Sequence, residues 1–235
     1  MQAPSSRYHA IVVQQASGEP QQLFVLAHGF GANAADLVPL AERIAKAFPH
    51  STVISIEAPL PAGKAGGFQW FPLTDINETS RVERISDALP GFCAEIRAWQ
   101  RDTGATPAVT ALVGFSQGAM MALESTAGAE IIAARVVAIS GRFATLPVQV
   151  PEQATFHLLH GKEDTVVPCR HTVDAAHWLL ELGGDVTADI VPFIGHEIDD
   201  ELIDLLLQRL RSHVPKRIWQ EAMRDVPAPA TDTKN

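Results

Sequence analysis

The feature that most constrains this chain is the pentapeptide GFSQG at residues 114–118. It continues the apolar run ALVGF and opens the helix-like run AMMALEST, so we expect a strand, a tight turn and a helix around Ser116. Side chains two residues away on either side of that serine would collide with the neighbouring elements, so both positions require glycine. The pattern is expected by chance about 0.05 times in a chain of this composition, which leaves a glycine-flanked helix cap as the weaker interpretation.

Short apolar runs alternate with longer amphipathic stretches along the whole chain, a pattern typical of a parallel sheet covered by helices. We expect strands at Tyr8–Val13, Leu23–Ala27, Thr52–Glu57, Val109–Gly114, Val136–Ile139, Phe156–His160 and Val186–Val191. We expect helices at Asn33–Phe48, Glu78–Arg101, Gln117–Ala127, Arg170–Leu182 and Ile198–Ser212, with a kink or break at Pro90-Gly91. The prediction is an α/β protein with one domain over residues 1–224, a mostly parallel sheet, no large cap domain and a flexible tail over residues 225–235.

Composition excludes several classes of function. The net charge of −9 argues against a general nucleic-acid binder, and no apolar run approaches the 18 residues of a membrane span. The beginning of the sequence lacks the apolar stretch of a signal peptide, so we expect a cytoplasmic protein. Neither Cys93 nor Cys169 lies in a CxxC motif, so both are expected to be unpaired thiols.

A serine nucleophile needs a base, and on this kind of sheet the chain order is serine, acid, histidine. Asp164 follows the strand-like run TFHLLH and is the predicted acid, with Glu163 as the neighbouring alternative. His196 follows the last expected strand and is the predicted base; a surface-loop histidine and a metal site at His196-Glu197 are the weaker alternatives, because HEIDD lacks the second histidine of HExxH.

Two backbone amides are needed to stabilise the oxyanion. One should be the amide of Gln117, directly after the serine. The other should be the amide of Phe30, in the stretch His28-Gly29-Phe30-Gly31 that follows an early strand. His28 is interpreted as a hydrogen-bonded structural histidine rather than a second base, and a plain glycine-rich turn is the alternative interpretation of the whole stretch.

Together, HGFGAN, the QWF string, GFSQG, HGKEDTVVP and GHEI make the chain resemble the phospholipase/carboxylesterase family of small α/β-hydrolases, which includes bacterial serine esterases and acyl-protein thioesterases. The resemblance implies a Ser116–Asp164–His196 triad, an oxyanion hole from the amides of Phe30 and Gln117, and no cofactor. It also implies that Phe68, Trp70 and Phe71 shape the acyl pocket, although Trp70 and Phe71 equally fit a core role. Ala32 and Pro72 stand where members often carry Asp, which bears on loop geometry and substrate fit rather than on the triad.

The predicted function is hydrolysis of small-molecule carboxylic esters with short to medium acyl chains, through an acyl-Ser116 intermediate. A thioesterase or lysophospholipase with the same triad is the first alternative, and a catalytically silent binding module is the second. The sequence does not indicate an oligomeric state.

The segment Arg209–Arg224 is locally basic and contains Ile218, Trp219 and Met223. The favoured interpretation is a solvated C-terminal helix that packs its tryptophan on the body of the protein. A helix on a membrane surface is the alternative.

Overall fold

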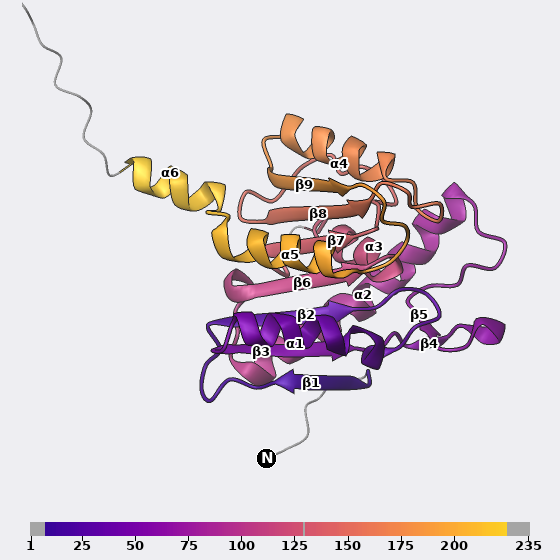
Figure 1. Cartoon of the computed structure of the whole chain (residues 1–235), viewed down its shortest axis with the longest axis horizontal. Helices are drawn as coiled ribbons and strands as arrows, with labels where there is room; N and C mark the ends of the chain where they lie inside the picture. The colour runs from indigo at the N-terminus through magenta and orange to yellow at the C-terminus, as the bar shows by residue number, and fades with distance from the viewer. Residues whose placement is uncertain (1–7, 129, 225–235) are drawn as a thin grey trace, which may run out of the picture.

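The computed structural model describes residues 8–128 and 130–224, and its centre is a seven-stranded sheet (Figure 1). The strand order is β1-β3-β2-β6-β7-β8-β9, and every neighbouring pair is parallel except β1 with β3. The strands are β1 (Ala10–Gln14), β2 (Gln22–Ala27), β3 (Ser51–Ile56), β6 (Thr110–Phe115), β7 (Arg135–Ile139), β8 (Thr155–Gly161) and β9 (Asp185–Val191). The α/β fold with a mostly parallel sheet is therefore confirmed.

Helices cover both faces of the sheet, as they must when its strands are apolar on both sides. One face is covered by α2 (Glu78–Thr103), α3 (Gln117–Glu124) and α4 (Arg170–Glu181), whose buried residues include Phe92, Met121 and Leu179. The other face is covered by α1 (Val38–Ala47) and α5 (Asp200–Ser212), through Ile44 and Leu206 among others. These two apolar layers hold the strand ends in the fixed positions from which the site is built.

The expected strands and the first five helices are confirmed to within a few residues of each end. A kink or a break was expected at Pro90-Gly91, and the break is wrong, because α2 runs from Glu78 to Thr103 with Pro90 inside it. An interior proline costs a helix about 3 kcal/mol. The buried side chains of Ile85, Phe92, Ile96 and Trp99 lie on both sides of the proline, and each contributes roughly 1.5–3 kcal/mol, so packing outweighs the proline.

The long connection at residues 58–77 contains structure that the sequence pattern did not indicate. Two short strands, β4 (Leu60–Pro61) and β5 (Phe68–Gln69), pair antiparallel around a single turn of 3₁₀ helix at Gly63–Ala65. An isolated bridge joins Ala32 to Phe68, and the amide of Gly31 donates to the carbonyl of Phe68 at 2.8 Å. This small hairpin is thereby attached to the loop that follows β2.

A sixth helix, α6 (Lys216–Arg224), follows α5 after a short extended segment and extends away from the body of the molecule (Figure 1). None of its residues is buried, and the side chain of Trp219 is 59 % exposed. It lines an open cavity with Leu180 and Val186 of the body, so the predicted tryptophan lies beside the body without being packed closely on it. The flexible tail predicted at residues 225–235 lies outside the described residues. Among the helices that the structure describes, none is long and apolar enough to cross a bilayer.

Candidate active site

Ser116 lies at the sharp turn between β6 and α3, with a φ of 52° that is uncommon for a residue with a side chain. The turn is held by the Ser116 amide, which donates to the carbonyl of Ile139 at 2.9 Å. A Cβ at Gly114 would stand 2.4 Å from the carbonyl oxygen of Gly118, and one at Gly118 would stand 2.1 Å from the carbonyl oxygen of Ala27. Both flanking positions therefore exclude any side chain, for the reason expected from the motif.

The loop after β2 lies directly against this turn. Ala27 pairs with Gly114 across the sheet, so the two strands end at the same level. A Cβ at Gly29 would meet the Cβ of Ser116 at 3.2 Å, which measures how closely the two segments approach. The amides of Gly31 and Ala32 already donate to the carbonyls of Phe68 and Gly29, so neither is available to a substrate.

The two predicted oxyanion donors come from these adjoining segments. Phe30 stands in the loop after β2, between Gly29 and the engaged amide of Gly31. Gln117 is the first residue of α3, where the helix itself supplies no acceptor for the amide and directs its positive end toward the site.

The loops after β8 and β9 bring the predicted acid and base together. Gly161 pairs with Val191 at the ends of these strands, and the amides of Lys162 and Glu163 donate to the carbonyls of Val191 and Ile194. In this arrangement Nδ1 of His196 lies 2.7 Å from Oδ2 of Asp164, and Nε2 of His196 lies 2.9 Å from Oγ of Ser116. Three side chains separated by up to 80 residues thus form one continuous hydrogen-bonded chain.

The carboxyl group of Asp164 is fully buried but well supplied with donors. Its Oδ1 accepts from the amides of Val166 at 2.9 Å and Val167 at 2.8 Å, while Oδ2 faces His196. Burial alone would raise the pKa of Asp164, but hydrogen bonds from His196, Val167 and Val166 stabilise the carboxylate and lower the pKa below its ordinary value. An ionised Asp164 can only accept, so Nδ1 of His196 carries the hydrogen and Nε2 is free to accept from Ser116.

His160 is a residue of this site that the sequence reasoning missed. Its Nε2 lies 3.1 Å from Oδ2 of Asp164 and 2.7 Å from the carbonyl of Val167, and its Nδ1 lies 2.7 Å from Oγ1 of Thr172. Because both partners of Nε2 are acceptors, Nε2 carries the hydrogen and Nδ1 accepts from the Thr172 hydroxyl. Burial lowers the pKa of His160, so the ring is a neutral donor that supports Asp164. The only signal in the sequence was a histidine at the end of a buried strand, four residues before the acid.

The remaining sequence alternatives are placed clearly. Glu163 is exposed, and the carboxyl that meets His196 belongs to Asp164. His28 is fully buried, its Nε2 accepts from the amide of Ala58 at 3.0 Å, and burial lowers its pKa. The structure therefore places His28 as a structural histidine. The ring of Phe115 packs on His196 with centroids 5.0 Å apart, a contact that limits the orientations of the imidazole.

The aromatic residues predicted for the acyl pocket have a structural role. Trp70 and Phe71 are buried, and Phe68 is half-buried. The side chain of Gln117 accepts from the amide of Trp70 at 2.8 Å and donates to the carbonyl of Phe71 at 2.7 Å. Trp70 also donates through Nε1 to the carbonyl of His28 at 2.8 Å. This segment therefore fixes the backbone around both predicted oxyanion donors.

Trp70 and Phe71 also line a half-open cavity of about 410 Å³ against α2, together with Tyr8, Pro59, Leu60, Pro72, Arg84, Asp87, Ala88 and Gly91. Ser116 and His196 are not among the residues that line this cavity. The contribution of the aromatic residues to an acyl pocket remains a prediction.

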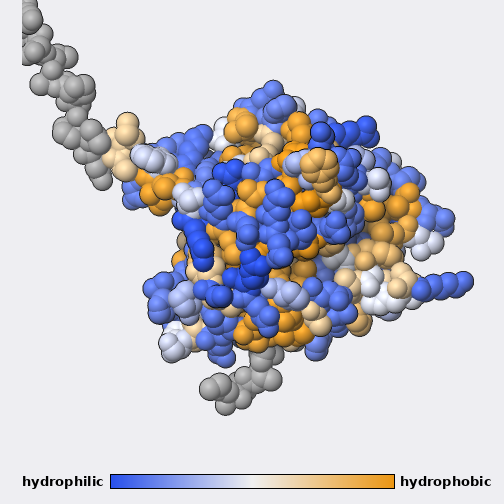
Figure 2. Space-filling view, in the orientation of Figure 1, coloured by the Kyte–Doolittle hydropathy of each residue, from blue (hydrophilic) through white to orange (hydrophobic). Residues whose placement is uncertain are grey.

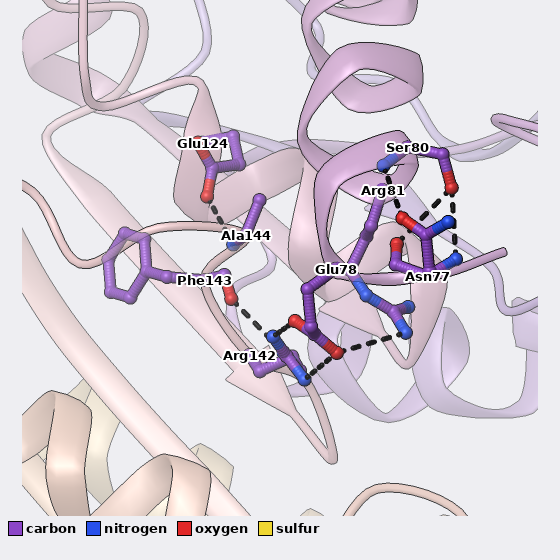
Figure 3. A network of polar contacts seen from close by, with 8 residues as sticks. All are labelled: Asn77, Glu78, Ser80, Arg81, Glu124, Arg142, Phe143 and Ala144. Atoms are coloured by element: carbon purple, nitrogen blue, oxygen red, sulfur yellow. Dashed lines mark hydrogen bonds and ion pairs between the residues drawn. The ribbon is translucent and has the colours of Figure 1, made fainter.

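The loop after β7 borders the same edge of the sheet and is held from two sides (Figure 3). Arg142 pairs with Glu78 at the start of α2 and donates to the carbonyl of Phe143, while Asn77 caps the same helix. Glu124 of α3 accepts from the amide of Ala144. Burial raises the pKa of Glu124, and the backbone donors oppose that rise. These contacts keep the loop at residues 141–147 in a defined position beside the nucleophile turn.

Comparison with known proteins agrees with this geometry. The model of the phospholipase/carboxylesterase family matches residues 8–214. Esterase YpfH of Escherichia coli strain K12 is 39 % identical over 217 residues, which cover 92 % of this chain and 94 % of that protein. An acyl-protein thioesterase 1 of Emericella nidulans is 27 % identical over 81 % of this chain and 90 % of its own length.

Among solved structures, that of esterase PE8 matches with a TM-score of 0.77 and 30 % identity, over 88 % of this chain and 99 % of that one. The family match spans the whole sheet and every predicted site residue. This chain therefore belongs to the phospholipase/carboxylesterase family of carboxylic ester hydrolases, with the α/β-hydrolase fold.

Proposed function

We propose that this protein hydrolyses carboxylic esters through a covalent acyl-Ser116 intermediate, with His196 as the proton carrier and Asp164 as the residue that orients it. The single observation that carries the proposal is the hydrogen-bonded chain from Ser116 through His196 to Asp164, with contacts of 2.9 and 2.7 Å. The imidazole is 18 % exposed whereas the carboxylate is fully buried, so the base can reach a substrate while its orienting group is shielded from water.

In the first half of the reaction, Oγ of Ser116 attacks the ester carbonyl carbon while Nε2 of His196 takes the hydroxyl proton. The carbonyl oxygen becomes an oxyanion and accepts hydrogen bonds from the amides of Phe30 and Gln117. Asp164 keeps the imidazole in the tautomer that accepts this proton and stabilises the imidazolium that forms. The C–O bond to the alcohol then breaks, and Nε2 of His196 returns the proton to the departing oxygen.

In the second half, His196 takes a proton from a water molecule as the water oxygen attacks the acyl carbon of the ester on Ser116. The second oxyanion forms against the same two amides. When the bond to Oγ breaks, the proton returns from His196 to Ser116 and the carboxylic acid leaves. The enzyme is thereby restored without any change in the charge of Asp164.

Esters with short to medium acyl chains are the proposed substrates, because no large cap domain covers the strand ends in the part of the chain that the structure describes. Thioesters are the second candidate class, since the relative from Emericella nidulans is called an acyl-protein thioesterase. Lysophospholipids remain the third class to compare. A silent binding module is disfavoured, because it would have no need to hold Ser116 in a strained turn against a histidine.

The decisive experiment uses a serine-directed fluorophosphonate probe with intact-mass detection. The wild type should gain one adduct on Ser116, and S116A should gain none and lose on the order of 10⁶ in kcat. The matched control is S125A, since Ser125 is also buried and stands at the end of the same helix. Unchanged hydrolysis by a folded S116A protein would remove Ser116 from the mechanism.

The substrate class is decided by a separate comparison. Values of kcat/KM are measured for p-nitrophenyl esters of increasing acyl length, for matched acyl thioesters and for a lysophospholipid. The proposal expects the highest values for oxygen esters with short to medium chains. A clear preference for long-chain thioesters or for the lysophospholipid would show that the enzyme acts on that substrate class instead. The proposed triad would not be affected by that result.

A further inference from the structure

Helix α6 divides cleanly into two sides. At 100° per residue, Ile218, Trp219, Ala222 and Met223 fall on one side, and Lys216, Arg217, Gln220, Glu221 and Arg224 fall on the other. The side chains of Ile218, Trp219 and Met223 are 46, 59 and 66 % exposed. Surface helices normally bury their apolar side against the core, so an apolar side this exposed is an inversion of the usual arrangement.

The inversion has a structural cause at the start of the helix. The amide of Lys216 donates to Asp185 at 2.9 Å, its Nζ donates to the carbonyl of Gly183 at 2.7 Å, and Arg217 donates to the carbonyl of Gln153 at 2.9 Å. Lys216 and Arg217 thus attach the start of the helix to the body. Ile218 and Met223 are left exposed, and Trp219 lines an open cavity with Leu180 and Val186. Figures 1 and 2 show the helix extending from the body with hydrophobic surface along it.

The segment that contains this helix has a net charge of opposite sign to that of the whole protein. Residues 211–224 contain four cations (Arg211, Lys216, Arg217 and Arg224) and one carboxylate (Glu221), a net charge of +3 on a chain whose net charge is −9. An apolar strip with a tryptophan, bordered by lysine and arginine, is the pattern of a helix that lies in the headgroup region of a bilayer. Anionic lipids add an attraction for each cation near the surface.

We propose that α6 attaches this enzyme peripherally to an anionic lipid surface, with Ile218, Trp219 and Met223 buried among the headgroups. A second copy of the chain is the rival occupant of the same face. A two-fold contact between identical helices would bring two segments of net charge +3 together, whereas an anionic membrane meets the same charge with attraction. The charge therefore favours the membrane.

The position of α6 in the fold determines what this attachment can do. The last turn of α5 accepts from Arg135, the first residue of β7, through the carbonyl of Leu210, and His213 lies 2.8 Å from Asp185, the first residue of β9. Helix α6 therefore begins at the amino-terminal edge of the sheet, whereas the site forms at the carboxyl-terminal edge. The active site of the attached enzyme would face away from the lipid. The membrane would therefore fix the location of the enzyme, and the ester would reach the site from the aqueous phase.

The test is co-sedimentation of the full chain with vesicles of phosphatidylcholine containing about one-third phosphatidylglycerol, against vesicles of phosphatidylcholine alone. Binding is expected only with the anionic vesicles and should weaken as salt is raised. The double variant W219S/M223S should bind at least roughly tenfold more weakly, and R211Q/R224Q roughly 30-fold more weakly, from about 1 kcal/mol for each cation.

The control variant is V148S, which removes another exposed apolar side chain, 90 % exposed and outside α6, and should bind like the wild type. All variants should keep the thermal midpoint of the wild type, since no residue of α6 is buried and both Arg211 and Val148 are exposed. Saturating anionic vesicles should leave kcat/KM for a dissolved ester unchanged.

Failure of the wild type to sediment with anionic vesicles would overturn the proposal. So would equal binding by W219S/M223S and V148S. A dimer in vesicle-free sedimentation velocity that becomes monomeric in W219S/M223S would show that a second copy covers the helix. None of these outcomes touches the ester hydrolysis proposed for Ser116.

Discussion

Replacing Gly118 by alanine perturbs the nucleophile turn without altering a single reacting group. The new Cβ would stand 2.1 Å from the carbonyl oxygen of Ala27 and 2.7 Å from that of His28. Both atoms belong to the backbone at the end of β2, the central strand that pairs with β3 on one side and β6 on the other. Because β2 is held by strands on both sides, it cannot move away from the new Cβ, so the start of α3 must move instead.

The size of that movement follows from the contact itself. Cβ atoms essentially never approach closer than 3.0 Å, so the start of α3 must shift by about 0.9 Å. Ser116 lies two residues away, and a misplacement of about 1 Å costs on the order of 10²-fold in rate. Forcing an extra methyl group into a packed site also costs about 1–3 kcal/mol of unfolding free energy. We therefore expect kcat/KM for a p-nitrophenyl ester to fall about 100-fold, with a modest loss of stability.

The assay normalises the rate to the fraction of protein that reacts with a fluorophosphonate, so that unfolded molecules are not counted. Circular dichroism and a thermal melt report whether G118A is folded. The matched control is G18A, because a Cβ at Gly18 meets nothing within 4 Å. A folded G118A protein with the specific activity of the wild type would refute the argument that steric exclusion at this glycine positions the nucleophile.

Three further perturbations test the buried ionisable groups. D164N should lose about 10⁴-fold in kcat with little change in KM, because an amide no longer enforces the tautomer of His196; a loss below tenfold in steady-state kinetics would exclude the orienting role. Burial lowers the pKa of His157 to about 3, so this histidine stays neutral in the folded state while the unfolded chain binds a proton below pH 6.5. As the pH is lowered from 6.5 to 3, the unfolding free energy of the wild type should fall by up to about 1.4 kcal/mol per pH unit. Urea titrations of H157Q should give a smaller fall per pH unit. Burial raises the pKa of Glu124, so its contribution to stability is present below pH 4.5 and is lost as the pH rises through the folded pKa. E124Q should therefore gain stability relative to the wild type as the pH is raised above 4.5, and parallel stability curves would contradict this.

Local patterns in the sequence predicted most of the fold, because the spacing of apolar residues shows which faces of a strand or helix are buried. The run LFVLA is apolar throughout and became β2, and TFHLLH, with Phe156, Leu158 and Leu159, became β8. The helical spacing of Leu202, Leu206 and Leu210 became the buried side of α5. Pro90 shows where local reasoning failed, since its cost is local while the packing of Phe92 and Trp99 that offsets it comes from distant strands. The same holds for α6, whose helical character was visible in the sequence but whose exposed apolar side depends on how contacts with Asp185, Gly183 and Gln153 attach the start of the helix.

For the site, the residue types and their order could be predicted from the sequence: a serine between two glycines, an acid after one strand and a histidine after the next. Chain order works because parallel strands all end at one edge of the sheet. The sequence favoured Asp164 over Glu163, and the structure has Asp164 against His196. Only the tertiary structure reveals that His160, Phe115 and the Gln117 side chain support the reacting groups. These contacts join residues from different strands and loops. They form only when β6, β8 and β9 lie at fixed separations, and a pattern within one segment of sequence does not determine the distance between strands.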